Sequence, residues 1–207
     1  GKHSIGTAKA GESVDLSQGC LVGKLQLWDL DSPNLYQAKV RIMDGEKVLD
    51  EQTATFGIRD ARFEAATGFW LNGRNFKLKG VCLHHDGGAV GAAVPLAIWE
   101  RRLNQLREFG CNAIRTAHNP PAPDFLDLCD RMGFIVMDEM FDCWTVAKNP
   151  YDYHLYFKEW SLIDTRDTVR RDRNHPSIVV YSAGNEIHDT PKPEIAKPIL
   201  ASLVAAF

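Results

Sequence analysis

From residue 76 onward, short apolar runs alternate with longer segments whose apolar residues recur at helical spacing. The apolar runs predict strands at 76–83, 112–115, 134–137 and 178–181, and the longer segments predict helices at 96–109, 123–132, 160–172 and 194–207. Near-continuous apolar strands that alternate with helices are typical of a parallel sheet covered by helices. We therefore predict an α/β fold with about four βα units, which is half of a closed (β/α)8 barrel.

The helices have predicted inner faces and ends. Trp99, Leu103, Leu106 and Phe109 share one face of the first helix, and Gly110 is placed to end it. In the third helix we expect Trp160, Ile163 and Val169 to face the core. Pro123 and Gly133 bracket the second helix, as is typical of helix starts and ends.

The first part of the chain has a different rhythm, with strands separated by frequent turn signals. Strands are expected at 35–43 and 47–58 around an Asp44-Gly45 hairpin turn, with shorter strands at 61–65 and 69–71 before a second signal at Asn72-Gly73. This is antiparallel sandwich material, but too short for a whole sandwich domain of ~100 residues. We predict a partial β-sandwich at 1–72 and the half barrel at 73–207.

Composition narrows the function classes. The chain has 207 residues, 44% of them apolar and 25% charged, as in ordinary globular proteins. A net charge of −3 does not indicate the positively charged surface that binding to nucleic acid or to a membrane requires. No apolar run is long enough to span a membrane and no signal peptide is visible, which slightly favours the cytoplasm. Five widely spaced cysteines without a CxxC pair predict buried, reduced thiols rather than a zinc site.

Each predicted strand of the second part ends in polar residues. These clusters are His84, His85 and Asp86; Arg115, His118 and Asn119; Asp138, Glu139 and Asp142; and Asn185, Glu186, His188 and Asp189. Because the carboxyl ends of parallel strands meet at one edge of a sheet, the clusters should converge. Polar helix caps and loops would produce part of the same pattern. The recurrence of Arg, His and acids favours a site.

Two expectations follow for single residues in these clusters. His84 and His85 are adjacent, so a strand points them to opposite sides and only one can face the site. Arg115 lies near the end of a buried strand and needs an anionic partner, which Asp138, Glu139 or Glu186 could supply.

Several spaced motifs in a fixed order give the chain a family resemblance. They are FGIR at 56–59, LNG at 71–73, LKGV at 78–81, NAIRTAH at 112–118, LCDRMG at 128–133, MDE at 137–139, RDRNHPS at 171–177 and NE at 185–186. With these motifs the chain resembles glycoside hydrolase family 2, the group of β-galactosidases, β-glucuronidases and β-mannosidases. The resemblance implies that the first part is the end of an immunoglobulin-like sandwich and the second is the first half of a TIM barrel.

The resemblance also implies residue roles. Glu186 matches the general acid/base of the family, and Asn185 matches the residue that hydrogen-bonds the sugar 2-hydroxyl. His84, Arg115 and His118 match side chains that line the sugar pocket or support the acid/base.

Asp138 and Glu139 match supporting residues near the substrate. The resemblance puts the nucleophile of the family on a second Glu at the end of the seventh strand, which the four units here do not include. Asp138 or Glu139 as a substitute nucleophile is a minor alternative.

The chain also departs from the best-known β-galactosidases of the family. It has CLHH at 82–85 in place of their Asn-Arg-His-Glu run, and DEMFDCW at 138–144 lacks their metal-binding Glu-x-His. We therefore predict no metal and no cofactor. DEMFD is similar to other branches of the family, so the sugar stays open.

The leading prediction is hydrolysis of terminal β-D-glycosides, foremost β-galactosides, with a carbohydrate as partner. One alternative is an inactive sugar-binding or scaffold fragment, with a stacking platform built from Trp70, Trp99, Trp144 and Trp160, although the spacing of Trp99 and Trp160 favours a core position. Another is a metal-dependent hydrolase using His84, His118, Asp138, Glu139, Asp142 and Glu186. Because a half barrel exposes strand edges and apolar surface, we also expect a homo-oligomer.

Overall fold

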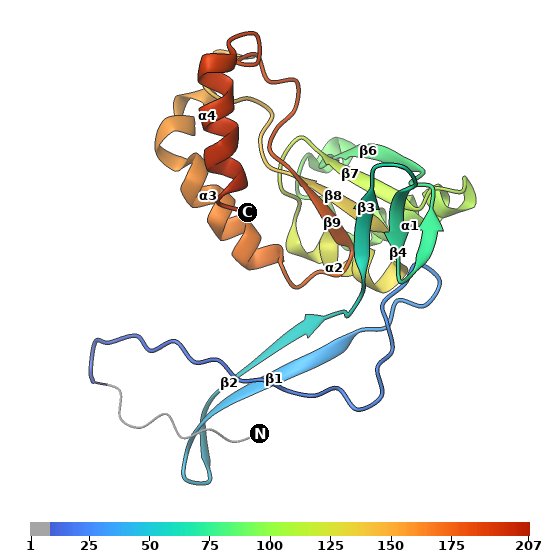
Figure 1. Cartoon of the computed structure of the whole chain (residues 1–207), viewed down its shortest axis with the longest axis vertical. Coiled ribbons are helices and arrows are strands. Elements are labelled where there is room, and N and C mark those ends of the chain that lie inside the picture. Colours follow the sequence, from blue (N-terminus) through green and yellow to red (C-terminus); the bar gives the residue numbers. More distant parts are fainter. Residues whose placement is uncertain (1–8) are drawn as a thin grey trace.

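The computed structural model of the protein describes residues 9–207, so the first eight residues of the predicted sandwich segment lie outside the described part (Figure 1). The strands are β1 Tyr36–Asp44, β2 Lys47–Phe56, β3 Ala61–Glu64, β4 Gly68–Leu71, β5 Arg74–Phe76, β6 Gly80–His84, β7 Ala113–Ala117, β8 Ile135–Glu139 and β9 Ile178–Ser182. The α-helices are α1 Leu96–Glu108, α2 Pro123–Met132, α3 Phe157–Asp172 and α4 Pro193–Val204, and two short 3₁₀ helices span Gly88–Val90 and Tyr153–Leu155.

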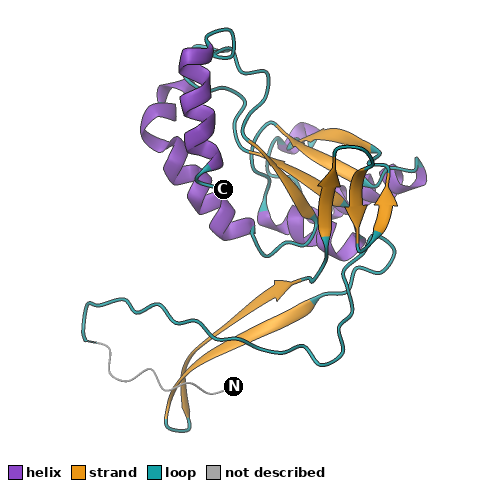
Figure 2. Ribbon diagram, in the orientation of Figure 1, coloured by secondary structure: helices purple, strands orange, loops and turns teal. Residues whose placement is uncertain are grey.

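The second part of the chain is the predicted half barrel. Strands β6, β7, β8 and β9 form one parallel sheet in that order, and each is followed by a helix. Figure 2 shows α1 and α2 on one side of this sheet and the pair α3 and α4 beside it. The predicted α/β fold with four βα units is confirmed.

The strand predicted at 76–83 is two strands in the structure. β5 ends at Phe76 and pairs antiparallel with β4, whereas β6 begins at Gly80 and pairs in parallel with β7. A Cβ on Gly80 would lie 3.0 Å from the carbonyl oxygen of Ala113, so the close strand pairing requires glycine there. The segment resembles one strand in the sequence because two short strands, which belong to different sheets, follow each other with only three residues between them.

Helices α1 and α2 cover one side of the sheet, and most of the residues predicted to face the core of the protein do so. Trp99 and Leu103 are buried in a core shared with both helices and the strands, as predicted. Phe109 is 85% exposed, against the prediction, because α1 ends at Glu108 and the chain turns away. Gly133 ends α2 with φ 67°, and a Cβ there would also meet the carbonyl oxygen of Leu30 at 2.2 Å.

Helix α3 differs from its prediction in both start and orientation. It begins at Phe157, and its buried residues are Phe157, Ser161, Thr165 and Asp172. Trp160 and Ile163, which were expected to face the core, are each 44% exposed. Because three of the four buried positions are polar, a search for apolar residues selects the wrong face.

The first part of the chain closes the amino-terminal end of the sheet and then extends away from it. Trp28 is fully buried among Phe69, Leu71, Ala113 and Ile135, and its indole nitrogen donates to the carbonyl oxygen of Asp130 at 2.8 Å. The β1–β2 hairpin projects from this base as a long ribbon (Figure 1). It is the predicted hairpin, whereas the domain boundary at 72/73 stays a prediction.

Two further sequence predictions concern thiols and membranes. All five cysteines are free; Cys129 and Cys143 are buried as predicted, but Cys20 and Cys82 are exposed. Within residues 9–207, no helix combines the length and the hydropathy needed to cross a membrane.

Candidate active site

A partly buried ion pair lies where β7 and β8 end. Arg115 is in register with Met137, so Glu139, two residues further along β8, points to the same side of the sheet. The two side chains meet in a bidentate contact, with Arg115 Nε 2.9 Å and Nη2 2.7 Å from Glu139 Oε2. Glu139 is fully buried and is therefore the anionic partner that Arg115 needs.

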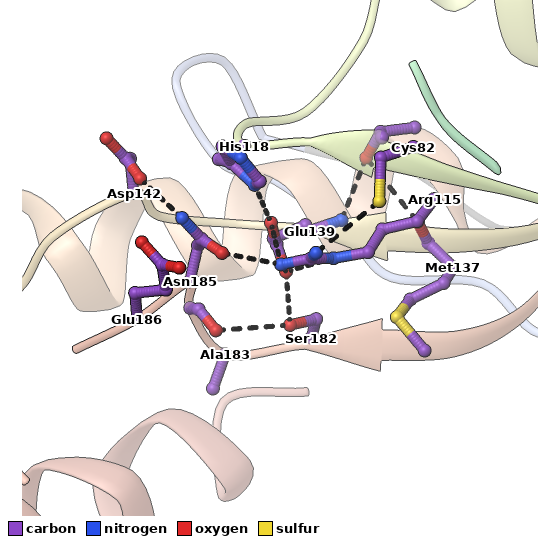
Figure 3. A network of polar contacts seen from close by, with 12 residues as sticks. Cys82, Arg115, His118, Met137, Glu139, Asp142, Ser182, Ala183, Asn185 and Glu186 are labelled. Atoms are coloured by element: carbon purple, nitrogen blue, oxygen red, sulfur yellow. Dashed lines mark hydrogen bonds and ion pairs between the residues drawn. The ribbon is translucent and has the colours of Figure 1, made fainter. Parts of the chain in front are cut away.

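Both carboxylate oxygens of Glu139 have further hydrogen-bond partners (Figure 3). Oε1 lies 2.7 Å from His118 Nδ1, and Oε2 accepts from Ser182 Oγ at 2.8 Å. Burial lowers the pKa of Arg115, but the hydrogen bonds and charge interactions with Glu139 and Cys82 together outweigh burial and raise this pKa above its ordinary value. Glu139 therefore serves as a saturated anchor that fixes Arg115 and His118.

Asn185 connects this anchor to the loop after β9. Its Oδ1 accepts from Arg115 Nη2 at 2.8 Å, and its Nδ2 donates to Asp142 Oδ1 at 2.8 Å. Its backbone N–H donates to the carbonyl oxygen of Phe141 at 2.8 Å. With only 7% of its surface exposed, Asn185 is held in one orientation.

Glu186 follows directly and has the opposite environment. Its side chain is 82% exposed and its φ is 42°, in the left-handed region that non-glycine residues seldom adopt. An exposed carboxyl group therefore stands beside a rigid, buried amide. This is the arrangement in the site with the clearest chemical use, because the carboxyl group is open to a bound molecule.

Sequence reasoning missed Lys148, which lies in the loop between β8 and α3. Its Nζ donates to Asp142 Oδ1 at 2.8 Å and lies 4.0 Å from Glu186 Oε2. Burial raises the pKa of Asp142, but hydrogen bonds from Lys148 and Asn185 outweigh it and hold this pKa below its ordinary value. No local pattern marks Lys148, since a lysine before Asn-Pro is an ordinary loop residue. Ser182 was missed too, although its place at the end of an apolar strand is a signal that could have identified it.

The two adjacent histidines separate as the strand alternation demands. His84 faces the site, where its ring meets the His118 ring edge-on at a centroid distance of 5.1 Å. His85 lies on the helix side against Trp99, with ring centroids 5.1 Å apart, and burial lowers its pKa. The structure thus brings His84 together with Arg115 and His118.

Asp138 is the predicted site residue that the structure does not bring into this group. It points to the opposite side of β8 from Glu139, toward the helices, and is fully buried. Its neighbours there are Thr116, Arg171 and Asp172. Burial, reinforced by the nearby Asp172 carboxylate, raises the pKa of Asp138 to about 7. The sequence predicts Asp138 beside the substrate, whereas the structure places it on the helix side of β8.

A pocket of about 490 Å³ adjoins the site at His118 and Asp142. Its other walls come from the loops after β7 and β8 and from α3. Phe141 and Tyr153 stack in one wall with ring centroids 5.1 Å apart. The pocket gives a bound molecule room beyond the ion-pair network.

The residues proposed for a metal centre do not form one. Within the described residues, the group with distances suited to an ion is Asp127, Asp130 and His175, which shares no member with the proposed set. His175 Nδ1 lies 2.6 Å from Asp130 Oδ2, and Asp130 Oδ1 accepts from the backbone N–H of Ser177 at 3.1 Å. These contacts tie α2 to the start of β9, so they serve packing.

Comparison of the sequence with protein families gives two matches. Residues 64–200 match the sequence model of "Glycosyl hydrolases family 2, TIM barrel domain", and residues 2–59 match "Glycosyl hydrolases family 2". Among curated proteins, the chain is 52% identical over 185 residues to a β-galactosidase of Bacteroides ovatus, covering 89% of this chain and 22% of that protein. It is 49% identical over 194 residues to a putative β-glucuronidase of Formosa agariphila, covering 93% of this chain and 18% of that protein.

Solved structures give the same result. A β-glycosidase from Bacteroides vulgatus superposes with a TM-score of 0.83 at 45% identity, over 89% of this chain and 24% of that one. A β-glucuronidase from Ruminococcus gnavus superposes with a TM-score of 0.75 at 30% identity, over 87% of this chain and 32% of that one. The chain thus spans about a fifth of the length of the two curated relatives described here.

Proposed function

The chain belongs to glycosyl hydrolase family 2, and from this membership we propose that it provides the acid/base side of a site that hydrolyses terminal β-D-glycosides. Glu186 is the proposed general acid/base, which protonates the leaving oxygen and then activates water. The observation that carries the proposal is its exposed carboxylate, which adjoins the buried network of Asn185, Arg115 and Glu139.

Asn185 is the proposed contact for a sugar hydroxyl. A primary amide can donate two hydrogen bonds and accept two. Within the described residues, Nδ2 makes one bond to Asp142 and Oδ1 accepts one from Arg115. One donor and one acceptor therefore stay available, and the 2-hydroxyl of a sugar can use both. His84 and His118 are the proposed walls of the same sugar site, and Arg115 and Glu139 its supports.

The charges of the site support a neutral sugar, with a β-galactoside first. Among the described residues, the cations of the site and its pocket are already paired: Arg115 with Glu139, Lys148 with Asp142, and Arg171 with Asp172. A uronate would bring a carboxylate that none of these cations is free to bind. The named relatives include both a β-galactosidase and a putative β-glucuronidase, so a β-glucuronide is the second candidate.

Glu139 is not proposed as the nucleophile. Retaining hydrolysis uses two carboxyl groups ~5–5.5 Å apart, and the second must be free to attack. Both Glu139 oxygens already have hydrogen-bond partners. Oε1 pairs with His118, Oε2 accepts from Ser182, and Arg115 donates to both oxygens. Turnover by a polypeptide that contains this chain then requires a different second carboxylate.

The sugar-binding alternative has less support than the hydrolase. Trp99 and Trp144 are 2% and 4% exposed, so neither can offer a face to a sugar. The Trp70 ring is covered by Arg62, whose guanidinium carbon lies 5.3 Å from the ring centroid. Trp160 is 44% exposed, but with Trp99 and Trp144 buried the four rings do not form a common stacking platform within the described residues.

The test of the proposed function uses Glu186→Gln with two kinds of β-galactoside. We expect a loss of about 10²–10⁴-fold in kcat/KM for a substrate with a poor leaving group, because that group needs a proton. Since kcat/KM reports the steps up to release of the leaving group, the loss in kcat/KM for nitrophenyl galactoside, whose leaving group needs little protonation, should be much smaller. The exposed Glu194→Gln is the matched control, and equal losses of kcat/KM on both substrates would remove Glu186 from the acid role. Nitrophenyl glucuronide in parallel decides between the two sugars.

A binding measurement covers the case in which the 207-residue chain shows no turnover. Galactose and glucuronate are titrated into the labelled chain and followed by NMR. Shifts of Asn185 and His118 with galactose are the expected result, and the His118 shift should be lost in Asn185→Ala. Galactose that perturbs neither residue would contradict a sugar site here.

A further inference from the structure

Lys148 is held in a fixed position by the loop that carries it. Its backbone N–H and that of Asn149 donate to Asp152 Oδ2 at 2.8 and 2.7 Å. This closes a tight turn between β8 and α3. The Lys148 side chain is only 14% exposed, although lysine is usually among the most exposed residues. The loop therefore presents the ammonium group inward to the site.

The ammonium group joins two acceptors that are themselves connected. Nζ donates to Asp142 Oδ1 at 2.8 Å and to the backbone carbonyl oxygen of Asn185 at 3.0 Å. Asp142 Oδ1 also accepts from the side chain of Asn185 at 2.8 Å (Figure 3). Lys148, Asp142 and Asn185 thus form a closed ring of hydrogen bonds that holds both the side chain and the backbone of Asn185.

The Asn185 carbonyl belongs to the peptide group that leads into Glu186. The orientation of that peptide plane contributes directly to φ of Glu186, which is 42°. A non-glycine residue in this region is energetically disfavoured and persists where the surrounding structure over-determines it. The bond from Lys148 is a restraint of this kind, because it fixes the carbonyl end of the peptide.

We propose that Lys148 is a positioning residue, which holds the Asn185–Glu186 peptide so that Glu186 keeps its left-handed backbone and its place beside Asn185. The importance of this role rests on the proposed function of Glu186 as the acid/base. The bond itself does not. A test that observes the peptide directly therefore separates the two claims.

The experiment uses the labelled 207-residue chain and NMR signals of two residues. The one-bond Cα–Hα coupling of Glu186 reports the sign of φ, and the carbonyl carbon shift of Asn185 reports the hydrogen bond from Lys148. In Lys148→Met we expect both signals to leave their wild-type values. Lys148→Arg, which keeps a cationic donor, should restore them, a rescue that loss of general packing would not show.

Two further variants make the result decisive. Lys158→Met removes a lysine from the exposed side of neighbouring α3 and should leave both signals unchanged. Lys148→Gln also removes the positive charge and shortens the side chain, and it takes the place of Lys148→Met if that variant does not fold. The proposal is overturned if a folded Lys148→Met or Lys148→Gln chain keeps both signals at wild-type values.

Activity gives a separate readout. Where turnover is measurable, Lys148→Met should lower kcat about tenfold with KM nearly unchanged, because positioning of the acid matters in the transition state. Lys148→Arg should recover most of this loss. Absence of turnover in every variant would count against the proposed function, whereas the two NMR signals would still decide the role of Lys148.

Discussion

At the scale of single residues, two neighbouring carboxyl groups have opposite environments. Glu139 faces the site and is compensated by Arg115, His118 and Ser182. Asp138 faces the helices, where one of its oxygens has no hydrogen-bond partner within the described residues. Strand alternation separates the two, and only Glu139 has compensation sufficient for a buried charge.

The raised pKa of Asp138 predicts a specific dependence of stability on pH. In the unfolded chain the pKa of an aspartate is about 3.9, whereas burial in the folded protein raises the pKa of Asp138 to about 7. Between these values the folded state keeps a proton that the unfolded state has lost. The contribution of this group to the free energy of unfolding therefore falls as pH rises through this window, by roughly 1.4 kcal/mol per pH unit at most.

Asp138→Asn should remove this contribution, since the amide does not ionise. We expect the free energy of unfolding of the variant to increase relative to that of the wild type as pH rises from about 4 to 7, by about 1–4 kcal/mol in total. Urea unfolding at pH 4.5, 6 and 7.5 measures the difference. The exposed Asp167→Asn is the control, and a difference between Asp138→Asn and wild type that stays constant with pH would contradict the prediction.

At the scale of elements, α3 shows how a partly polar interior changes the orientation of a helix. Thr165 is buried and its hydroxyl donates to the carbonyl oxygen of Ser161 at 2.7 Å. Asp172, also buried, accepts from Arg171 Nε at 2.6 Å. Polar residues become tolerable on the inner face once they have such partners. The apolar Trp160 is left half exposed.

This orientation predicts unequal costs for two aromatic truncations. Phe157 is 3% exposed and packs against Phe141 and Trp144, so Phe157→Ala should cost about 3–5 kcal/mol. Trp160→Ala should cost less than about 1 kcal/mol, because much of its ring stays in solvent. Urea unfolding of both variants at one pH measures the two losses in free energy of unfolding. A larger loss for Trp160→Ala would show that the helix face predicted from the sequence is the buried one.

At the scale of the whole molecule, two surfaces carry unsatisfied groups. β6 and β9 are the edges of the parallel sheet within the described residues, each with one row of free backbone groups. The projecting β1–β2 hairpin exposes apolar side chains, among them Val40 at 64% and Leu49 at 57%. Surfaces of this kind favour association.

We therefore propose that the 207-residue chain pairs with a second copy of itself at micromolar concentrations. Sedimentation over a concentration series should show a dimer that dissociates on dilution. Backbone amides of β6 should exchange more slowly as the dimer forms, whereas those of β7, which is paired on both sides, serve as the control. A monomer throughout the micromolar range would contradict the proposal.

The sequence by itself determined the order and kind of most elements. Apolar runs at strand length and stripes at helical spacing are local patterns, so they identified the parallel sheet, its four helices and the polar ends of its strands. The charge requirement of Arg115 predicted an anionic partner, and strand alternation required His84 and His85 to separate. Each of these inferences depends on residues close together in the chain.

Only the tertiary structure decided which distant groups meet. It selected Glu139 over Asp138 as the partner of Arg115, turned the polar side of α3 inward, and placed Lys148 against the carbonyl of Asn185, 37 residues away. A buried polar group is stable only where a partner completes its hydrogen bonds. That partner is supplied by packing between elements, and no local pattern in the chain records it.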